Sequence, residues 1–182
     1  MKPTRVLYQS RFLRLVERDG WEFVQRISTT GVVCIVAHTE RQQVVLVEQF
    51  RPPVAAPIIE WPAGLVGDRQ VEETPLEAAR RELLEETGHV SDHWERLFVA
   101  ASSAGLTDEC IEFYLALNCR RVAQGGGDAS ESITVHTIDR SVVDDWLRQR
   151  AAAGALLDAR IYAGLYWLDR RMEPQTSARR RG

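Results

Sequence analysis

The sequence lacks any long hydrophobic run. A helix that crosses a membrane needs about 20 consecutive apolar residues, and no segment of the 182 residues comes near that length. The first residues, Met1-Lys2-Pro3, show no signal-peptide pattern. We therefore expect a cytoplasmic protein with no membrane partner.

The chain also lacks an excess of either charge. It has 23 Lys and Arg against 26 Asp and Glu, which gives a formal net charge of −3. Proteins that bind nucleic acid usually carry a basic surface, so this balance predicts no nucleic-acid partner. The basic segment at 174–182 is short, and we interpret it as a frayed tail.

Cysteine is scarce. The three cysteines, Cys34, Cys110 and Cys119, have no metal-binding spacing, and one stays unpaired if the other two form a disulfide. Cys34 lies in an apolar segment, so we expect it in the core. The sequence also contains no internal repeat and no low-complexity segment.

The length and composition predict one domain. A chain of 182 residues and 20.6 kDa with 45% apolar residues is long enough to build a single core, but it leaves no room for a second domain. We expect N-terminal strands over about 5–30, a core over about 31–170 and the basic tail over 174–182.

The order of the predicted elements favours an α+β fold. Val- and Ile-rich segments predict a hairpin whose polar turn is 39–42, and Ser141 is expected to cap the first of two closing helices. Strands and helices do not alternate regularly, which is typical of a mixed sheet. The expected strands are 31–37, 43–48, 94–100, 111–117 and 132–138, and the closing helices are 141–153 and 159–170.

The segment from Gly67 to Gly88 carries the strongest signal. Gly67 is followed at fixed spacing by Glu73 and by the run from Arg81 to Gly88. Thr74-Pro75 predicts a helix start, with Thr74 as the cap, and Gly88 predicts its end.

Three carboxylates share one edge of this predicted helix. At about 100° per residue, Glu82, Glu85 and Glu86 fall within an arc of roughly 100°. Glu82 and Glu86 repel each other, and Arg81 cannot neutralise the whole cluster. Carboxylate oxygens suit Mg²⁺ or Mn²⁺, so we predict a metal there. The alternative is a solvated acidic helix with pairs such as Glu77 and Arg81.

The segment resembles the Nudix box of the Nudix hydrolases, which cleave nucleoside diphosphates linked to another group. The resemblance implies an α/β/α sandwich around a mixed sheet over about residues 5–170. His89 departs from the apolar or aromatic residue that is usual in the family. Residues 60–66 look like the loop that enters the box in the ADP-sugar branch, which leaves two candidates, Gly64 and Gly67, for the box turn.

A second segment, 21–26, alternates like a strand. Its spacing alone favours an edge strand with a surface ion pair. It also resembles the Trp-Glu-x-x-x-Arg stretch of ADP-sugar pyrophosphatases. That resemblance implies that Trp21 stacks on adenine, Glu22 meets the base edge and Arg26 approaches the terminal sugar or phosphate. Phe12 is either a second stacking aromatic or a core residue.

Further site residues follow from the same resemblance. Arg51, in a Gln-x-Arg stretch before Pro-Ala-Gly, is implied to grip the diphosphate, for which a planar guanidinium is suited. Leu65 and Ser103 are implied to contact the substrate. Glu131 follows a loop with three glycines and is implied to close over the metal, as a ligand or as the general base. Without the resemblance, Arg51 is interpreted as a surface charge and Glu131 as a solvated loop residue.

The resemblance therefore implies an ADP-ribose diphosphatase that releases AMP and ribose 5-phosphate, with the following metal ligands. Mg²⁺, or alternatively Mn²⁺, is expected on Glu82, Glu86, Glu131 and the carbonyl of Ala63, with Glu85 nearby. The resemblance implies a homodimer with N-terminal strands that reach across. Other nucleoside diphosphate sugars such as GDP-mannose, oxidised nucleoside diphosphates, or a non-catalytic ADP-ribose sensor are the alternatives.

Overall fold

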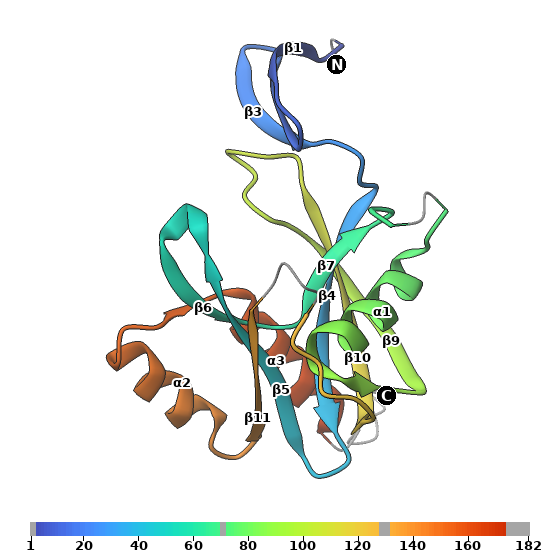
Figure 1. Cartoon of the computed structure of the whole chain (residues 1–182), viewed down its shortest axis with the longest axis vertical. Coiled ribbons are helices and arrows are strands. Elements are labelled where there is room, and N and C mark those ends of the chain that lie inside the picture. Colours follow the sequence, from blue (N-terminus) through green and yellow to red (C-terminus); the bar gives the residue numbers. More distant parts are fainter. Residues whose placement is uncertain (1–2, 70–71, 128–131, 174–182) are drawn as a thin grey trace, which may run out of the picture.

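The computed structural model describes residues 3–69, 72–127 and 132–173. Its strands form two separate sheets (Figure 1). The smaller sheet is antiparallel and has the order β1-β2-β3. In the larger one, β10 runs parallel to β4 and β12 parallel to β6, while the other pairs are antiparallel. The elements are β1 (Arg5–Gln9), β2 (Leu13–Arg18), β3 (Trp21–Arg26), β4 (Gly31–Thr39), β5 (Gln43–Arg51), η1 (Pro52–Val54), β6 (Ala56–Glu60), β7 (Ala63–Val66), α1 (Pro75–Thr87), β8 (His89–Val90), β9 (His93–Ala101), β10 (Cys110–Arg121), β11 (Ile133–Asp139), α2 (Val143–Ala152), β12 (Leu156–Leu157) and α3 (Arg160–Met172).

The central strand β4 shows why the fold has three layers. Its side chains alternate between two buried clusters, with Cys34 on one face and Ile35 on the other. Because successive side chains of a strand point to opposite faces, both faces of β4 must be covered. Helix α1 covers one face, and α2 and α3 cover the other. The predicted α/β/α sandwich around a mixed sheet is therefore confirmed.

The N-terminal sheet projects from one end of this sandwich (Figure 1). It is joined to the 102–109 loop by a backbone hydrogen bond from Val24 to Leu106 (2.8 Å). The side chain of Gln25 also donates to Asp108 there. The sheet therefore lies over the loop that leads into β10. Among the described residues, no helix has the length and apolar character needed to cross a membrane.

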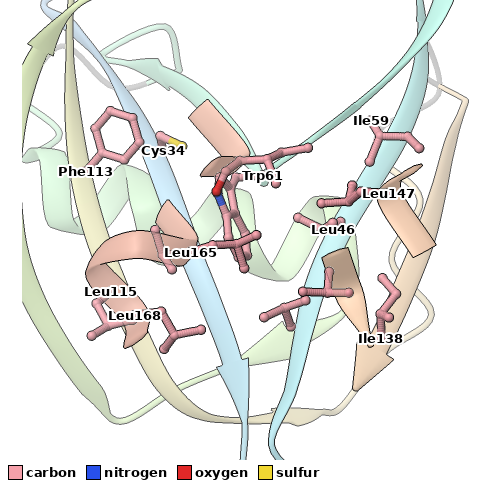
Figure 2. Close-up of a cluster of buried hydrophobic side chains, with 14 of the residues drawn as sticks. Cys34, Leu46, Ile59, Trp61, Phe113, Leu115, Ile138, Leu147, Leu165 and Leu168 are labelled. Carbon is pink, nitrogen blue, oxygen red and sulfur yellow. The ribbon is translucent and has the colours of Figure 1, made fainter. Parts of the chain in front are cut away.

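Trp61 fills the centre of the cluster on the α3 side (Figure 2). Its ring is 1% exposed, and its indole nitrogen donates to the carbonyls of Arg160 (3.2 Å) and Ile161 (3.3 Å). Helix α3 comes so near that a Cβ at Gly164 would lie 2.3 Å from that nitrogen. This contact fixes the start of α3 beside the end of β6.

Most of the expected elements are present, but two details were wrong. Ala63–Val66 is not a loop: it forms β7, which pairs with Gly31–Cys34 of β4. Ser141 does not cap α2, because the helix begins later, at Val143, and Ser141 instead donates to the carboxylate of Asp139 (2.6 Å). That short turn satisfies the hydroxyl before the helix starts.

We predict that Gly164→Ala destabilises the protein by about 1 to 3 kcal/mol, because the added methyl must displace the tightly packed indole of Trp61. Urea unfolding monitored by tryptophan fluorescence measures the change. Gly105→Ala is the matched control, because a Cβ at Gly105 meets nothing within 4 Å. Equal stability of the two variants would contradict the packing argument.

Candidate active site

A cleft of about 870 Å³ opens where β4 and β5 separate. The two strands pair only at Ala37–Val45 and His38–Val44, and beyond these pairs Val32 and Gln49 line the cleft. One wall is formed by α1 and the start of β7, and the other by the end of β5, the end of β6 and the start of α3. The strand divergence therefore brings segments far apart in sequence to one cavity.

Helix α1 begins and ends as its sequence predicts. Thr74 and Glu77 form a reciprocal capping box, in which the Thr74 hydroxyl accepts from the Glu77 amide and the Glu77 carboxylate from the Thr74 amide. Gly88 ends the helix in the left-handed region, at φ 71°. Between these ends, Ala79 and Leu83 are buried, while the carboxylates of the second half of the helix line the cleft.

Arg81 ties the acidic residues of the box together. Its guanidinium donates to Glu73 (2.8 Å), Glu82 (2.7 Å) and Glu85 (3.3 Å), and also to the carbonyl of Leu65 (3.0 Å). The Arg81 hydrogen bond lowers the pKa of Glu73, whose carboxylate also accepts from the Gly67 amide (3.2 Å). The spacing of Gly67, Glu73 and Arg81 in the sequence therefore corresponds to one bonded group.

Arg81 leaves the acidic wall under-neutralised, as the sequence predicts. Glu82, Glu85 and Glu86 line the cleft, and Glu86 is only 3% exposed. Burial raises the pKa of Glu82 to about 7, against the opposing effect of Arg81. Among the described residues, the carboxylates at this wall outnumber the guanidiniums. The carboxylates are Asp68, Glu73, Glu82, Glu85 and Glu86, and the guanidiniums are Arg69 and Arg81.

The two candidate glycines of the box have different tasks. Gly67 makes the turn, with φ 79°, where a side chain would be strained. Gly64 provides space, because a Cβ there would lie 2.0 Å from the carboxylate of Glu82. Both glycines are therefore needed for the acidic wall to approach β7.

Two carboxylates meet at the start of β7. The amide of Ala63 donates to Glu86 (3.1 Å), and Glu82 packs against Gly64. In the described ranges, no three His, Cys, Asp or Glu side chains surround a common point as metal ligands. Mg²⁺, however, commonly takes one or two carboxylates with water and substrate oxygens. Glu82, Glu86 and the backbone of Ala63 offer the hard oxygen donors that such an ion needs.

The opposite wall carries arginines. Arg51 is 40% exposed at its side chain. Its Nε donates to Oε1 of Glu60 (2.9 Å), and its Nη2 forms an ion pair with the same oxygen (2.7 Å). Arg160 contacts the other oxygen of Glu60 (3.3 Å) and is bound by Asp158 (2.8 Å). Burial raises the pKa of Glu60, although Arg51 and Arg160 oppose the shift. The cleft thus has an acidic wall opposite a wall with two guanidiniums.

The sequence of this chain matches a known protein family. The model of the NUDIX domain matches residues 28–136 of this chain, which is more than half of its 182 residues. The chain belongs to the Nudix family. Helix α1 and the turn before it are therefore its Nudix box, as the spacing of the sequence predicts.

The relatives that match this chain carry different functional names. A methanol dehydrogenase activator of Bacillus methanolicus is 37% identical over 53% of this chain and 51% of its own length. An ADP-ribose pyrophosphatase of Bacillus subtilis is 35% identical over 47% of this chain and 45% of its own length. A GDP-mannose pyrophosphatase of Cronobacter sakazakii is 30% identical over 71% of this chain and 68% of its own length. This Nudix chain thus spans about half the length of the first two relatives.

A solved structure has the same fold. The crystal structure of an ADP compounds hydrolase matches this Nudix chain with a TM-score of 0.70 and covers 94% of this chain and 95% of that one. The two sequences are only 18% identical, so the likeness shows the fold alone. It agrees with the three-layered arrangement described above.

Not every residue predicted for the site lies in the cleft of this chain. Arg26 and Leu65 line it, and Arg26 is paired with Glu109 at the rim. Ser103 is in the exposed 102–109 loop, where its neighbour Ser102 lines the cleft instead. Glu131 lies outside the described residues.

The predicted base-binding residues lie on the N-terminal sheet. Trp21 is 68% exposed and lines a separate hollow of about 310 Å³ between β3 and the 102–109 loop. Glu22 is exposed on the same strand. Phe12 is 65% exposed, with the guanidinium of Arg11 above its ring, so its interpretation as a core residue was wrong.

The sequence interpretation missed three cleft residues: Glu60, Asp158 and Arg160. Glu60 had a signal, since it is a charged residue between apolar neighbours, Ile59 and Trp61. Buried charges are usually paired, so such a residue predicts a cationic partner. Nothing in the sequence indicated that this partner includes Arg160, which is 100 residues away.

We predict that Glu82→Gln removes a pH dependence of stability in metal-free buffer. The folded-state pKa of Glu82, about 7, exceeds its ordinary value of 4.5, so the folded state retains a proton between these values. Its stabilising contribution is present below pH 4.5 and is lost as pH rises to about 7. The wild type should therefore lose up to roughly 3 kcal/mol relative to Glu82→Gln across this window.

Urea unfolding of both proteins between pH 4 and 8, with a chelator present, measures this difference. Glu77→Gln is the control, and its effect on the pH dependence of stability should have the opposite sign. The hydrogen bonds with Thr74 lower the pKa of Glu77, and a Gln at this position keeps the cap. Parallel pH profiles for the wild type and Glu82→Gln would contradict the prediction.

Proposed function

We propose that this Nudix chain is a metal-dependent hydrolase that cleaves the diphosphate of ADP-ribose and related ADP-sugars to AMP and a sugar phosphate. The observation that carries the proposal is the pairing of an acidic wall with an arginine wall across one cleft. A diphosphate is anionic, so it needs cationic groups on one side and a cation between it and the carboxylates on the other. The ADP-ribose pyrophosphatase among the relatives supports this substrate.

The two walls of the cleft have different roles in the proposed reaction. Glu82, Glu86 and the Ala63 carbonyl would hold the metal, with Glu85 beside them. When bound, Mg²⁺ or Mn²⁺ would supply charge neutralisation of the diphosphate and a more acidic water. Arg51 stabilises the charge that develops on the phosphate oxygens as water attacks phosphorus and the second phosphate leaves.

A general base completes the reaction. We assign this role to Glu131, which follows the Gly125–Gly127 loop. If Glu131 is not the base, Glu109 is the next candidate, because it lines the cleft. Glu112 is less suitable, since it does not line the cleft.

We further propose a homodimer in the cytoplasm. The N-terminal sheet exposes large apolar side chains, which is unusual unless another surface covers them. In such a dimer Trp21, Glu22 and Arg26 would serve a nucleotide, with Trp21 on the base and Glu22 at its edge. The exposed side chains on this sheet are Val6, Leu7, Tyr8, Phe12, Leu13 and Trp21.

A second candidate substrate is GDP-mannose. The GDP-mannose pyrophosphatase among the relatives covers a larger share of this chain than the ADP-ribose enzyme does. Both reactions need the same box and differ at the base. A non-catalytic sensor of ADP-ribose is less well supported, because Glu82, Glu85 and Glu86 are all present. Turnover of a panel of nucleotide sugars, with product identification, tests the proposal.

We predict that Glu82→Gln and Glu86→Gln each lower turnover about a hundredfold or more, because each removes a ligand charge and keeps the side-chain shape. Steady-state rates at saturating Mg²⁺ measure the loss. Glu77→Gln is the control, since it lies on the same helix and does not line the cleft. Near-wild-type rates in either variant, together with unchanged Mn²⁺ binding in calorimetry, would remove the metal assignment.

We predict that Trp21→Ala weakens ADP-ribose binding by roughly 1 to 3 kcal/mol, the usual range for a base stacked on an aromatic ring. Stacking tolerates any purine, whereas an edge contact discriminates between them. Glu22→Gln should therefore narrow the preference for the adenine sugar over its guanine counterpart. Competition kinetics with the paired sugars measure both effects.

The control for this pair is Tyr162→Ala, which removes an exposed aromatic ring from α3. If Trp21→Ala leaves the affinity for ADP-ribose unchanged, Trp21 does not stack on the base. A wild type that prefers the guanine sugar would favour the second candidate substrate.

A further inference from the structure

Glu60 is a buried carboxylate held between two arginines at the last residue of β6. It is 2% exposed, and its two oxygens divide the partners between them: Oε1 accepts from Arg51 and Oε2 from Arg160. An ion pair buried in this way contributes little net stability, because desolvation offsets the attraction. The apolar neighbours Ile58 and Ile59 show that this strand also accommodates aliphatic side chains. The carboxylate therefore calls for an explanation other than stability.

The two arginines are not held equally. Arg160 is bound by Asp158, to which Nε donates at 2.8 and 2.9 Å and Nη2 donates as well. Its contact with Glu60 is longer, 3.3 Å. Arg51 contacts Glu60 at 2.7 and 2.9 Å and has no other acceptor within the described part of the chain. Glu60 is therefore the group that determines where Arg51 points.

The geometry of the guanidinium makes this contact directional. Nε of Arg51 donates to Oε1 of Glu60, and Nη2 lies 2.7 Å from the same oxygen, so this carboxylate oxygen occupies one edge of the planar group. Because the group is planar, fixing that edge fixes the directions in which the Nη1 and Nη2 groups point. The side chain is 40% exposed and lines the cleft, so these remaining donors are accessible to an oxyanion.

The ion pair with Glu60 also keeps Arg51 on its own wall of the cleft. The acidic wall of α1 lines the same cleft, and an unrestrained guanidinium on a flexible side chain would be attracted to it. Such a contact would occupy Arg51 and block the space for substrate. A buried carboxylate behind Arg51 holds its charge on the opposite wall.

We propose that Glu60 is a positioning residue that holds one edge of Arg51 and so presents its other donors to the diphosphate of the substrate. The proposal rests on the proposed function for its substrate class. It assigns Glu60 no contact with the substrate, since both of its oxygens are turned to guanidiniums.

A double-mutant cycle tests the proposal with Glu60→Gln, Arg51→Gln and the double variant. Glu60→Gln should lower kcat/KM about ten- to a hundredfold, since misplacing a catalytic group by about 1 Å has an effect of this size. If Glu60 acts through Arg51, the same substitution should cause no further loss in Arg51→Gln. A purely structural role would give equal losses in both backgrounds, and this result would overturn the proposal.

Binding of α,β-methylene ADP, measured by calorimetry, gives a second readout that needs no turnover. We expect about tenfold weaker binding in Glu60→Gln and no further weakening in the Arg51→Gln background. A wild type that binds this probe but hydrolyses no nucleotide sugar would refute the proposed function, while the same cycle measured by probe binding would still decide the role of Glu60. A wild type that does not bind the probe would overturn the proposal.

Glu48→Gln is the matched control. Glu48 is also a largely buried carboxylate, 16% exposed at its side chain, and it accepts from Arg150 (2.7 Å) on a surface outside the cleft. It should change stability and leave kcat/KM unaltered. If Glu60→Gln does not fold, Glu60→Asp keeps the charge and shortens the arm by one methylene. A folded Glu60→Asp with full activity would overturn the proposal.

Discussion

The hydrogen bonds of Arg81 are the constraint on which the acidic half of the cleft depends. Carboxylates crowded at the end of a helix repel one another, and one guanidinium joins Glu73, Glu82 and Glu85 to the backbone of Leu65. The turn at Gly67 and the strand β7 are held to α1 by the same group. Arg81 thus joins the parts of the acidic wall, and among the described residues the carboxylates there still outnumber the guanidiniums.

The cleft separates charge between its two walls. On one side the carboxylates of α1 exceed their guanidinium partners, and on the other Arg51 and Arg160 are balanced by Glu60 and Asp158. The charged side chains of each wall are bound to residues of the same wall: Arg81 to the carbonyl of Leu65, and Arg51 and Arg160 to Glu60. Among the described residues, the unbalanced negative charge of the cleft therefore lies on the α1 wall, and the exposed guanidinium of Arg51 lies on the opposite wall.

Sequence reasoning was most accurate where the signals are local. The capping box, the end at Gly88 and the shared edge of Glu82, Glu85 and Glu86 all depend on helical spacing within one segment. It failed at Ser141, where a nearby Asp139 competes for the hydroxyl, and at β7, whose few residues are a strand only because β4 pairs with them. Short strands carry little periodicity of their own.

The sequence by itself determined the Nudix box, the mixed α+β architecture and the acidic edge of α1, because regular spacing converts directly into a shared face. Only the tertiary structure decided which glycine turns and which makes room, since Gly64 is needed because of Glu82, and that contact exists only after folding. It also decided the partners of Glu60, one of which is 100 residues away. Contacts at such separations arise from packing of the whole sheet, and no local pattern encodes them.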